Sequence, residues 1–262
     1  MDELRVSGLC VRETHTGEND KLITLITPEY GRISVSGKGV KSLKSKNMAA
    51  CQSFCLSNFL LRRTKRYYYI VESELIEPFW GLRSDLDKLA LAAYVCDVAC
   101  DVSVEGMADE EMFRLTLNTL YAIANKSSIP LPVIKGAFEF KCACVSGFMP
   151  DLTSCGRCGK RIVGDAYLDI MNGRLLCRDC RPLAEKEEEL LQDNGSARLY
   201  FSIDIAVVEA LRYIAESDVR RFLSFLLPPD EIYLFRDICE AYLINHLEHG
   251  FYTLDFYKSI LI

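Results

Sequence analysis

Alternating hydrophobic and polar positions dominate the first 80 residues. In Arg32-Ile-Ser-Val-Ser36, for example, Ile33 and Val35 fall on one face of an extended chain. Five segments of this kind, rich in β-branched and aromatic residues, are separated by turn formers. They are Leu4–Arg12, Leu22–Thr27, Gly31–Lys38, Phe54–Thr64 and Tyr67–Leu75. Five short strands with a longer link after the third predict a small Greek-key barrel of the OB type.

From residue 82 onward the hydrophobic period changes to that of a helix. Leu86, Leu89, Ala90 and Ala93 recur at the spacing of one helical face, and Cys96 extends the stripe. Helical spacing returns later in the chain, at residues 113–124, 133–145, 205–215 and 232–242. A helical bundle therefore follows the predicted barrel.

Four of the twelve cysteines form two closely spaced pairs. The pairs are Cys155 and Cys158 and, 18 residues later, Cys177 and Cys180. This spacing predicts a zinc site, because two residues between ligands let one turn aim both sulfurs at the same ion. The intervening segment predicts a hairpin with strands Ala166–Ile170 and Arg174–Leu176 around an Asn-Gly turn. Since four thiolates fill the coordination shell of Zn²⁺, we expect one structural ion.

A redox dithiol is the competing interpretation of the first cysteine pair. A redox motif, however, does not require a second pair at this distance. We expect the other eight cysteines to be buried as small hydrophobic side chains, as Cys96 and Cys100 would be on the first helical stripe.

These patterns together predict an α+β multidomain protein. An N-terminal OB-type β-barrel precedes a helical bundle domain with an inserted four-cysteine zinc module. The expected boundaries are 1–80 for the barrel, 81–150 for the first helical part, 151–182 for the zinc module and 183–262 for the second helical part.

Charge is distributed unevenly along the chain. The net charge is −6, yet no acid occurs in the 42 residues between Glu29 and Glu72. Nine bases lie in this segment: Arg32, Lys38, Lys41, Lys44, Lys46, Arg62, Arg63, Lys65 and Arg66. Such a segment in an acidic protein predicts a polyanion partner for the barrel. The alternative is a solvated face whose charges are balanced by acids elsewhere in the fold.

Aromatic residues adjoin the second group of bases. Tyr67 and Tyr69 share one face of an alternating strand, and Tyr68 occupies the other. OB folds bind single strands with a positive groove and aromatic rings on which bases stack. We therefore add Tyr67 and Tyr69 to the nine bases as candidate DNA-binding residues, with the barrel core as the alternative location for each ring.

Motifs of other protein classes are missing from the sequence. His246-Leu-Glu248 resembles the H-x-E of zinc deaminases but follows both cysteine pairs instead of preceding them. No catalytic constellation supports an enzyme. The first twenty residues hold no apolar segment of a secretory signal, and no apolar run could span a bilayer, which predicts a cytoplasmic protein without a membrane partner.

The order of these features resembles the RecO family of bacterial recombination mediators. The resembling stretches are ENDKLITLITPEYG at 18–31, Gly37-Lys-Gly39 with the lysines that follow, Glu74-Leu-Ile76, Phe138-Glu-Phe140, and Ser146-Gly-Phe-Met-Pro-Asp151 leading into the first cysteine pair. The resemblance spans about residues 1–182, and the C-terminal helices are generic.

The resemblance implies a role without a covalent reaction. RecO-family proteins bind single- and double-stranded DNA, anneal complementary strands and, with RecR, help load RecA onto strands coated by single-stranded-DNA-binding protein (SSB). A cytoplasmic, nucleoid-associated location follows. An acidic SSB tail with an apolar tip would need a groove between helices, so we expect it to bind within 82–147 or 198–262. The alternative is a zinc-ribbon protein that binds RNA or a protein through its four-cysteine module.

Overall fold

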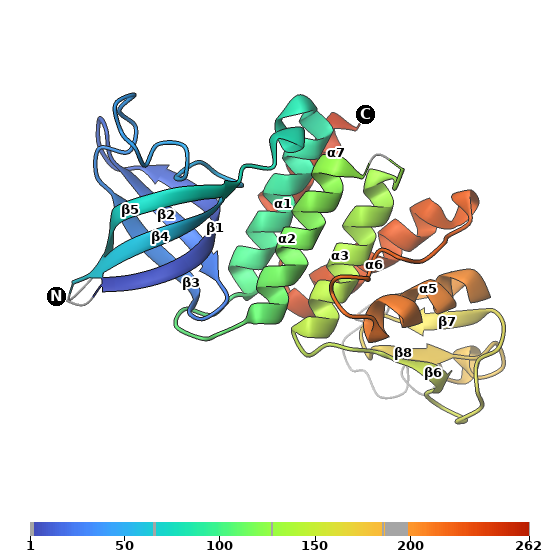
Figure 1. Cartoon of the computed structure of the whole chain (residues 1–262). Coiled ribbons are helices and arrows are strands. Elements are labelled where there is room, and N and C mark those ends of the chain that lie inside the picture. The colour runs from blue at the N-terminus through green and yellow to red at the C-terminus, as the bar shows by residue number, and fades with distance from the viewer. Residues whose placement is uncertain (1–2, 65–66, 127, 185, 187–198, 262) are drawn as a thin grey trace. The chain divides into compact units, whose positions relative to one another are not determined.

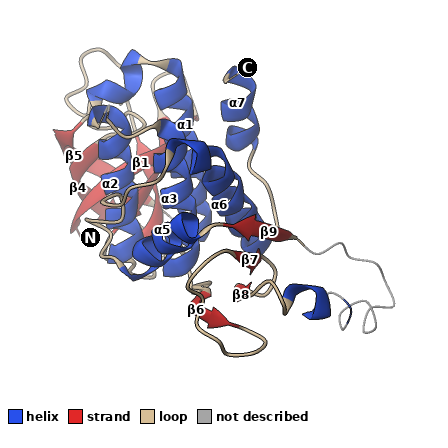
Figure 2. Ribbon diagram, turned by 90° about the vertical axis from the view of Figure 1, so that its right-hand side faces the viewer, coloured by secondary structure: helices blue, strands red, loops and turns tan. Residues whose placement is uncertain are grey.

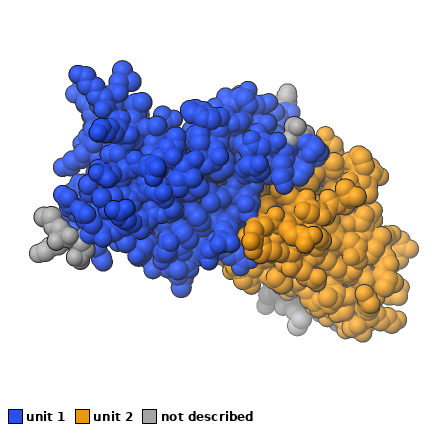
Figure 3. All heavy atoms as spheres, viewed as in Figure 1, with its two compact units in different colours: residues 1–131, 251–262 blue, residues 132–250 orange. Residues whose placement is uncertain are grey.

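The structure is a computed structural model and describes residues 3–64, 67–126, 128–184, 186 and 199–261. The chain divides into two compact units, which Figure 3 distinguishes by colour. The first unit comprises residues 1–131 and 251–262, and the second comprises residues 132–250. The first unit is therefore built from two stretches of chain that the whole second unit separates in sequence.

Five strands of the first unit form a closed barrel, coloured blue to cyan in Figure 1. They are β1 (Glu3–His15), β2 (Lys21–Thr27), β3 (Gly31–Gly37), β4 (Leu56–Arg63) and β5 (Tyr68–Glu77). Their order around the barrel is β1-β2-β3-β5-β4. A short parallel pairing of β3 with β5 closes the barrel, with Val35 opposite Tyr68 and Ser36 opposite Tyr69. This topology confirms the predicted OB-type fold.

The barrel is filled by its own side chains. Ile33 and Val35 are buried while Ser34 between them is exposed, as the alternation predicts. The core consists of Val6, Cys10, Ile23, Leu25, Ile33, Val35, Val40, Cys51, Phe59 and Leu61. Because the interior of so small a barrel has no room for a ligand, recognition is left to the outer faces and the loops.

Three helices and a 3-10 turn complete the first unit. They are η1 (Trp80–Ser84), α1 (Leu86–Val102), α2 (Glu110–Asn125) and α7 (Tyr252–Ile260). Asp85 and Asp109 cap α1 and α2 by accepting hydrogen bonds from backbone N–H groups of the first turn. The helix α7, which the sequence patterns did not predict, packs on α1, where Thr253 Oγ1 donates to Asp97 Oδ2 at 3.0 Å.

The turn between β2 and β3 fastens the barrel to the segment between α1 and α2. Gly31 has a φ of +56°, and a Cβ at this position would lie 2.2 Å from the carbonyl oxygen of Val104. Gly106 N donates to Tyr30 O and Asp109 N donates to Pro28 O, both at 3.0 Å. Only glycine permits this close approach, which orients the barrel within the first unit.

The second unit combines helices with a small sheet (Figure 1). Its elements include α3 (Leu131–Val145), β6 (Asp151–Cys155), β7 (Ala166–Asp169), β8 (Arg174–Leu176), β9 (Tyr200–Ile203), α5 (Ile205–Glu216), η2 (Pro229–Glu231) and α6 (Ile232–Leu247). The sheet order is β6-β8-β7-β9, and Figure 2 shows β9 beside β7. The predicted hairpin is confirmed as the antiparallel pair β7–β8, whereas β6 and β9 were not predicted.

Buried charges join the helices of the second unit. Lys135 on α3 donates to Glu139 Oε1 at 2.7 Å and to Glu240 Oε2 on α6 at 2.8 Å. Lys141 donates to the carbonyl oxygens of Ala215 and Ser217 where α5 ends. The eight cysteines outside the two pairs are all buried, as predicted.

Candidate metal centre and nucleic-acid interface

The four paired cysteines meet at one point of the second unit. Their sulfur atoms all lie within 4.8 Å of one another. The Sγ atoms of Cys158 and Cys177 are 3.9 Å apart, close to the roughly 3.8 Å between sulfurs of a tetrahedral site with 2.3 Å bonds. Cys155 ends β6 and Cys177 follows β8, so the sheet supplies one cysteine of each pair. The donor set therefore fits a tetrahedral metal ion.

Electrostatics in the cluster favour a bound cation. Burial raises the pKa of Cys155, but hydrogen bonds from backbone N–H groups, including that of Cys177 at 3.4 Å, outweigh it and lower this pKa to about 6. Burial and the neighbouring thiols raise the pKa of Cys180 to about 12. The Cys155 thiol thus loses its proton readily while the Cys180 thiol keeps its proton, because negative charge accumulates among the four sulfurs. A divalent cation would remove this conflict.

A buried carboxylate organises the hairpin that carries the second pair. Asp169 has no exposed surface and accepts hydrogen bonds from Asn172 Nδ2 at 2.7 Å and Arg174 Nε at 3.1 Å. Gly173 completes the turn with a φ of +57°. The guanidinium of Arg181 lies 5.4 Å from the ring centre of Tyr167. The module around the cysteines is therefore held by its own polar contacts as well as by the thiol cluster.

Cationic and aromatic side chains meet on one outer face of the barrel. In the strand register, Tyr69 of β5 lies between Ser36 of β3 and Arg62 of β4. Lys38, just beyond β3, holds its ammonium 5.3 Å from the centre of the Tyr69 ring. Three predicted residues from different parts of the sequence thus form one row, called here the Tyr69 row. A ring flanked by two cations suits a base and its adjacent phosphates.

The three consecutive tyrosines divide between the barrel core and its surface. Tyr68 packs against the core together with Ile70. Tyr67 is exposed, and Tyr69 is half-buried beneath Lys38. Of the three rings, Tyr67 and Tyr69 are therefore placed where a base could reach them.

The loop after β3 carries the three predicted lysines. Lys44 and Lys46 are exposed and Lys41 is half-buried. Asn47 Oδ1 accepts hydrogen bonds from the backbone N and the hydroxyl of Ser73, both at 3.0 Å, and so ties this loop to β5. The basic loop is therefore fixed to β5 four residues along the strand from Tyr69.

The remaining candidate bases differ in their surroundings. Arg63 is exposed at the end of β4, and Arg62 pairs with Glu3 at 3.2 Å. Arg32 is half-buried and donates to the carbonyl oxygen of Cys100 on α1 at 2.9 Å, which gives it a packing role inside the first unit. The two candidates outside the described residues are Lys65 and Arg66.

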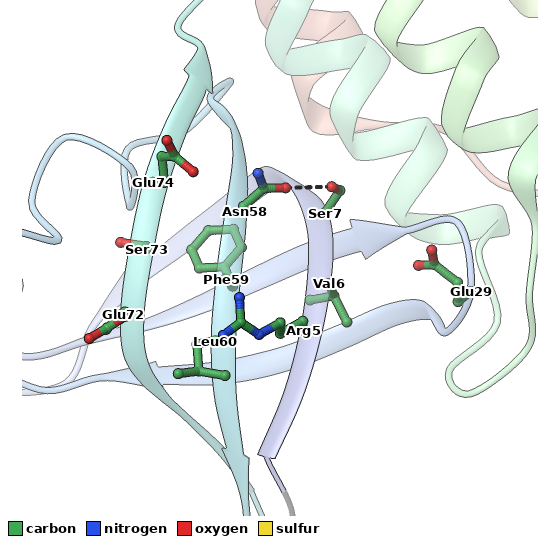
Figure 4. Close-up of a pocket in the computed structure, with 10 residues that line it drawn as sticks. All are labelled: Arg5, Val6, Ser7, Glu29, Asn58, Phe59, Leu60, Glu72, Ser73 and Glu74. Atoms are coloured by element: carbon green, nitrogen blue, oxygen red, sulfur yellow. Dashed lines mark hydrogen bonds between the residues drawn. The ribbon is translucent and has the colours of Figure 1, made fainter.

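Charge changes sign farther along the same strands. A hollow of about 450 Å³ is lined there by Arg5, Ser7, Asn58, Leu60, Glu72, Glu74 and neighbouring residues, drawn in Figure 4. The Ser7 hydroxyl donates to Asn58 Oδ1 at 2.6 Å. Glu72 and Glu74 would repel phosphate groups, so the charge of this hollow does not suit a polyanion.

Comparison with known proteins identifies the family. The family model described as Recombination protein O N terminal matches residues 1–79, and the one described as Recombination protein O C terminal matches residues 83–255. The chain belongs to the RecO family. This finding confirms the resemblance and associates the chain with DNA repair and recombination.

Individual RecO proteins match over most of the chain. The DNA repair protein RecO of Acetivibrio thermocellus is 29% identical over 260 residues, which cover 99% of this chain and 98% of that protein. RecO of Dehalococcoides mccartyi strain 195 is 30% identical, with 83% of this chain and 80% of that protein covered. Within the described part of this RecO-family chain, no helix is both long and apolar enough to cross a membrane.

Proposed function

We propose that this RecO-family protein is a DNA-binding mediator of recombination and repair. It binds single- and double-stranded DNA, anneals complementary strands and, with RecR, helps load RecA onto strands coated by SSB. The observation that carries the proposal is the Tyr69 row beside the basic loop. The protein works at the bacterial nucleoid by binding, and no bond is made or broken.

Phosphates and bases are bound by different side chains in this proposal. The phosphate-binding group is Lys38, Lys41, Lys44, Lys46, Arg62 and Arg63. Tyr67 and Tyr69 stack on bases, which contributes about 1–3 kcal/mol per base in single-strand binding proteins. Because neither group reads base identity, binding is expected to tolerate any sequence.

The salt dependence of binding tests the basic loop. Each phosphate contact to a single strand makes the slope of log K against log salt more negative by about 0.7. Replacing the three loop lysines together by serine should therefore make the slope shallower by about two units. Anisotropy of a labelled oligonucleotide gives K at each salt concentration. An unchanged slope would move the DNA site elsewhere.

A matched triple replacement in the second unit separates this proposal from the alternative ligand site. Arg157, Lys160 and Arg161 lie at the four-cysteine module, where they could serve an RNA- or protein-binding ribbon. Serine at these three positions should leave the DNA slope unchanged. A shallower salt slope in this variant, together with an unchanged salt slope in the variant of the three loop lysines, would favour the four-cysteine module as the binding site.

We also propose that the four thiolates hold one structural Zn²⁺. The tetrahedral spacing of the sulfurs supports it, and an all-sulfur set is typical of zinc. Elemental analysis of protein purified without chelator should find one zinc per chain. Cys158→Ser should abolish this content, whereas Cys96→Ala, a change at a buried cysteine of the first unit, should not. Protein without zinc would refute the assignment.

The SSB tail is proposed to bind the helical part, within 82–147 or 198–262. The barrel core is filled, and the hollow on its outer strands is lined by Glu72 and Glu74, whose charges would repel an acidic tail. DNA and tail should then bind together. Titrating a tail peptide into a protein–oligonucleotide complex should leave the anisotropy of the oligonucleotide high. Full displacement by stoichiometric peptide would indicate a shared site on the barrel.

A further inference from the structure

Leu43 projects from the basic loop with almost no contact to the protein. Its side chain is 91% exposed, more than any other large hydrophobic residue in the described part of the barrel. It occupies the second position of the turn Ser42–Ser45, which a hydrogen bond from Ser45 N to Ser42 O closes at 2.8 Å. Since this leucine buries little surface in the fold, its hydrophobic side chain is available to a ligand.

Both ends of the loop are fixed, so Leu43 cannot fold back easily onto the barrel. At one end, Gly39 N donates to Asp20 Oδ1 at 2.7 Å, and Lys41 N donates to Asn19 O at 3.1 Å. Val40 between them is buried in the barrel core. At the other end, Asn47 is bound to β5 as described above. The five residues between these anchors present Leu43 at their apex.

The surroundings of Leu43 select a polyanion that also has apolar surfaces. Lys41, Lys44 and Lys46 lie within three residues of it, and the acid-free segment extends on both sides. A nucleic acid alternates phosphates with flat apolar bases at this scale. The exposed ring of Tyr67 and the half-buried ring of Tyr69 belong to the same barrel and suit the same ligand.

We infer that Leu43 is a wedge that inserts between two adjacent bases of a single strand while the flanking lysines hold its phosphates. The inference rests on the proposed DNA binding and deepens it. Leucine is among the side chains that enter base steps and unstack them in DNA-deforming proteins. The wedge holds one step of the bound strand open, with its base edges accessible to a complementary strand.

Fluorescence of 2-aminopurine tests the wedge in the full-length protein. This base brightens when it is unstacked, so an oligonucleotide with a central 2-aminopurine among adenines should brighten on saturation with the wild-type protein. Leu43→Ala should reduce the brightening about fivefold or more and weaken binding about tenfold. The salt slope should stay within about half a unit, because the lysines remain. Leu43→Met should keep most of the signal.

Leu226→Ala is the matched control, since Leu226 is 96% exposed but lies in the second unit. It should brighten the probe as the wild type does. A saturated wild-type complex without brightening, equal brightening with Leu43→Ala, or an equal loss with Leu226→Ala would overturn the wedge while DNA binding stands. Failure of the wild type to bind any strand would overturn the proposed function and the wedge with it.

Discussion

Replacing Lys135 by methionine should destabilise the second unit strongly. The Lys135 side chain is 1% exposed and that of Glu139 is fully buried, and their charged atoms are 2.7 Å apart. Methionine matches the length of the lysine stem, so packing is largely kept and the main loss is the ammonium. Removing one partner of a buried ion pair costs about 3–5 kcal/mol, because the other charge stays in the interior.

The pH dependence separates this mechanism from a packing defect. Burial lowers the pKa of Lys135, but attraction to Glu139 and Glu240 outweighs it and raises this pKa. The lysine in the wild type therefore stays charged, and its contribution is lost only as the pH rises above about 10. In Lys135→Met, the buried Glu139 carboxyl should bind a proton more tightly when folded than when unfolded. The loss of stability should therefore be smaller near about pH 5 than near about pH 8.

Urea and thermal unfolding followed by circular dichroism measure the effect. A loss of about 3–5 kcal/mol corresponds to a fall in Tm of about 10–20 °C for a unit of this size. Adding Glu139→Gln should restore about half of the loss by removing the unpaired charge. Arg114→Ala is the control, because Arg114 and Glu110 form an exposed pair, and it should change stability by less than about 0.5 kcal/mol.

Three results would refute this reasoning about the buried pair. The first is a loss of less than about 1 kcal/mol in Lys135→Met. The second is an equal loss at both ends of the pH range. The third is a double variant with Glu139→Gln that is no more stable than the single variant.

Two further changes test the packing of each unit. Gly81→Ala should destabilise the first unit by about 1–3 kcal/mol in thermal unfolding, because its Cβ would lie 2.3 Å from the carbonyl oxygen of Ala124. Gly164→Ala is the control and should be neutral, because a Cβ at position 164 would meet nothing within 4 Å. Burial lowers the pKa of His246, whose ring lies 5.0 Å from that of Phe148, so its contribution to stability should be lost as the pH falls below about 6.5. His246→Phe should flatten that part of the profile of Tm against pH, and an unchanged profile would contradict the assignment.

Local patterns predicted the barrel and the cysteine module well. Alternation placed Ile33 and Val35 in the core, and the Asn-Gly turn located the β7–β8 hairpin. Both signals depend on residues that are close in sequence, where chain geometry leaves few options. The proximity of Lys38 to Tyr69 in the Tyr69 row could not be predicted in this way, because the two residues meet only where β3 and β5 pair in parallel to close the barrel.

Long-range packing explains where the helical predictions failed. Leu86 was placed on the buried stripe of the first helix but is 56% exposed, whereas Tyr94 and Leu91 are fully buried. The helix α1 contacts β1, α2 and α7, so more than one face is covered and a single stripe does not describe it. Leu43 also escaped notice, because a leucine in a basic loop has no periodic signal.

The position of α7 in the sequence determines when the first unit can complete its fold during synthesis. A ribosome that adds about 5–20 residues per second needs roughly 6–24 s to pass from residue 132 to residue 250. During that interval the surface of α1 around Tyr94 and Asp97 lacks its contacts, because Phe251 and Thr253 have not yet been synthesised. The unit that contains the barrel therefore starts to fold before the second unit is synthesised but is completed only after it. Nascent chains meanwhile carry an open hydrophobic surface that a chaperone could cover until α7 is synthesised.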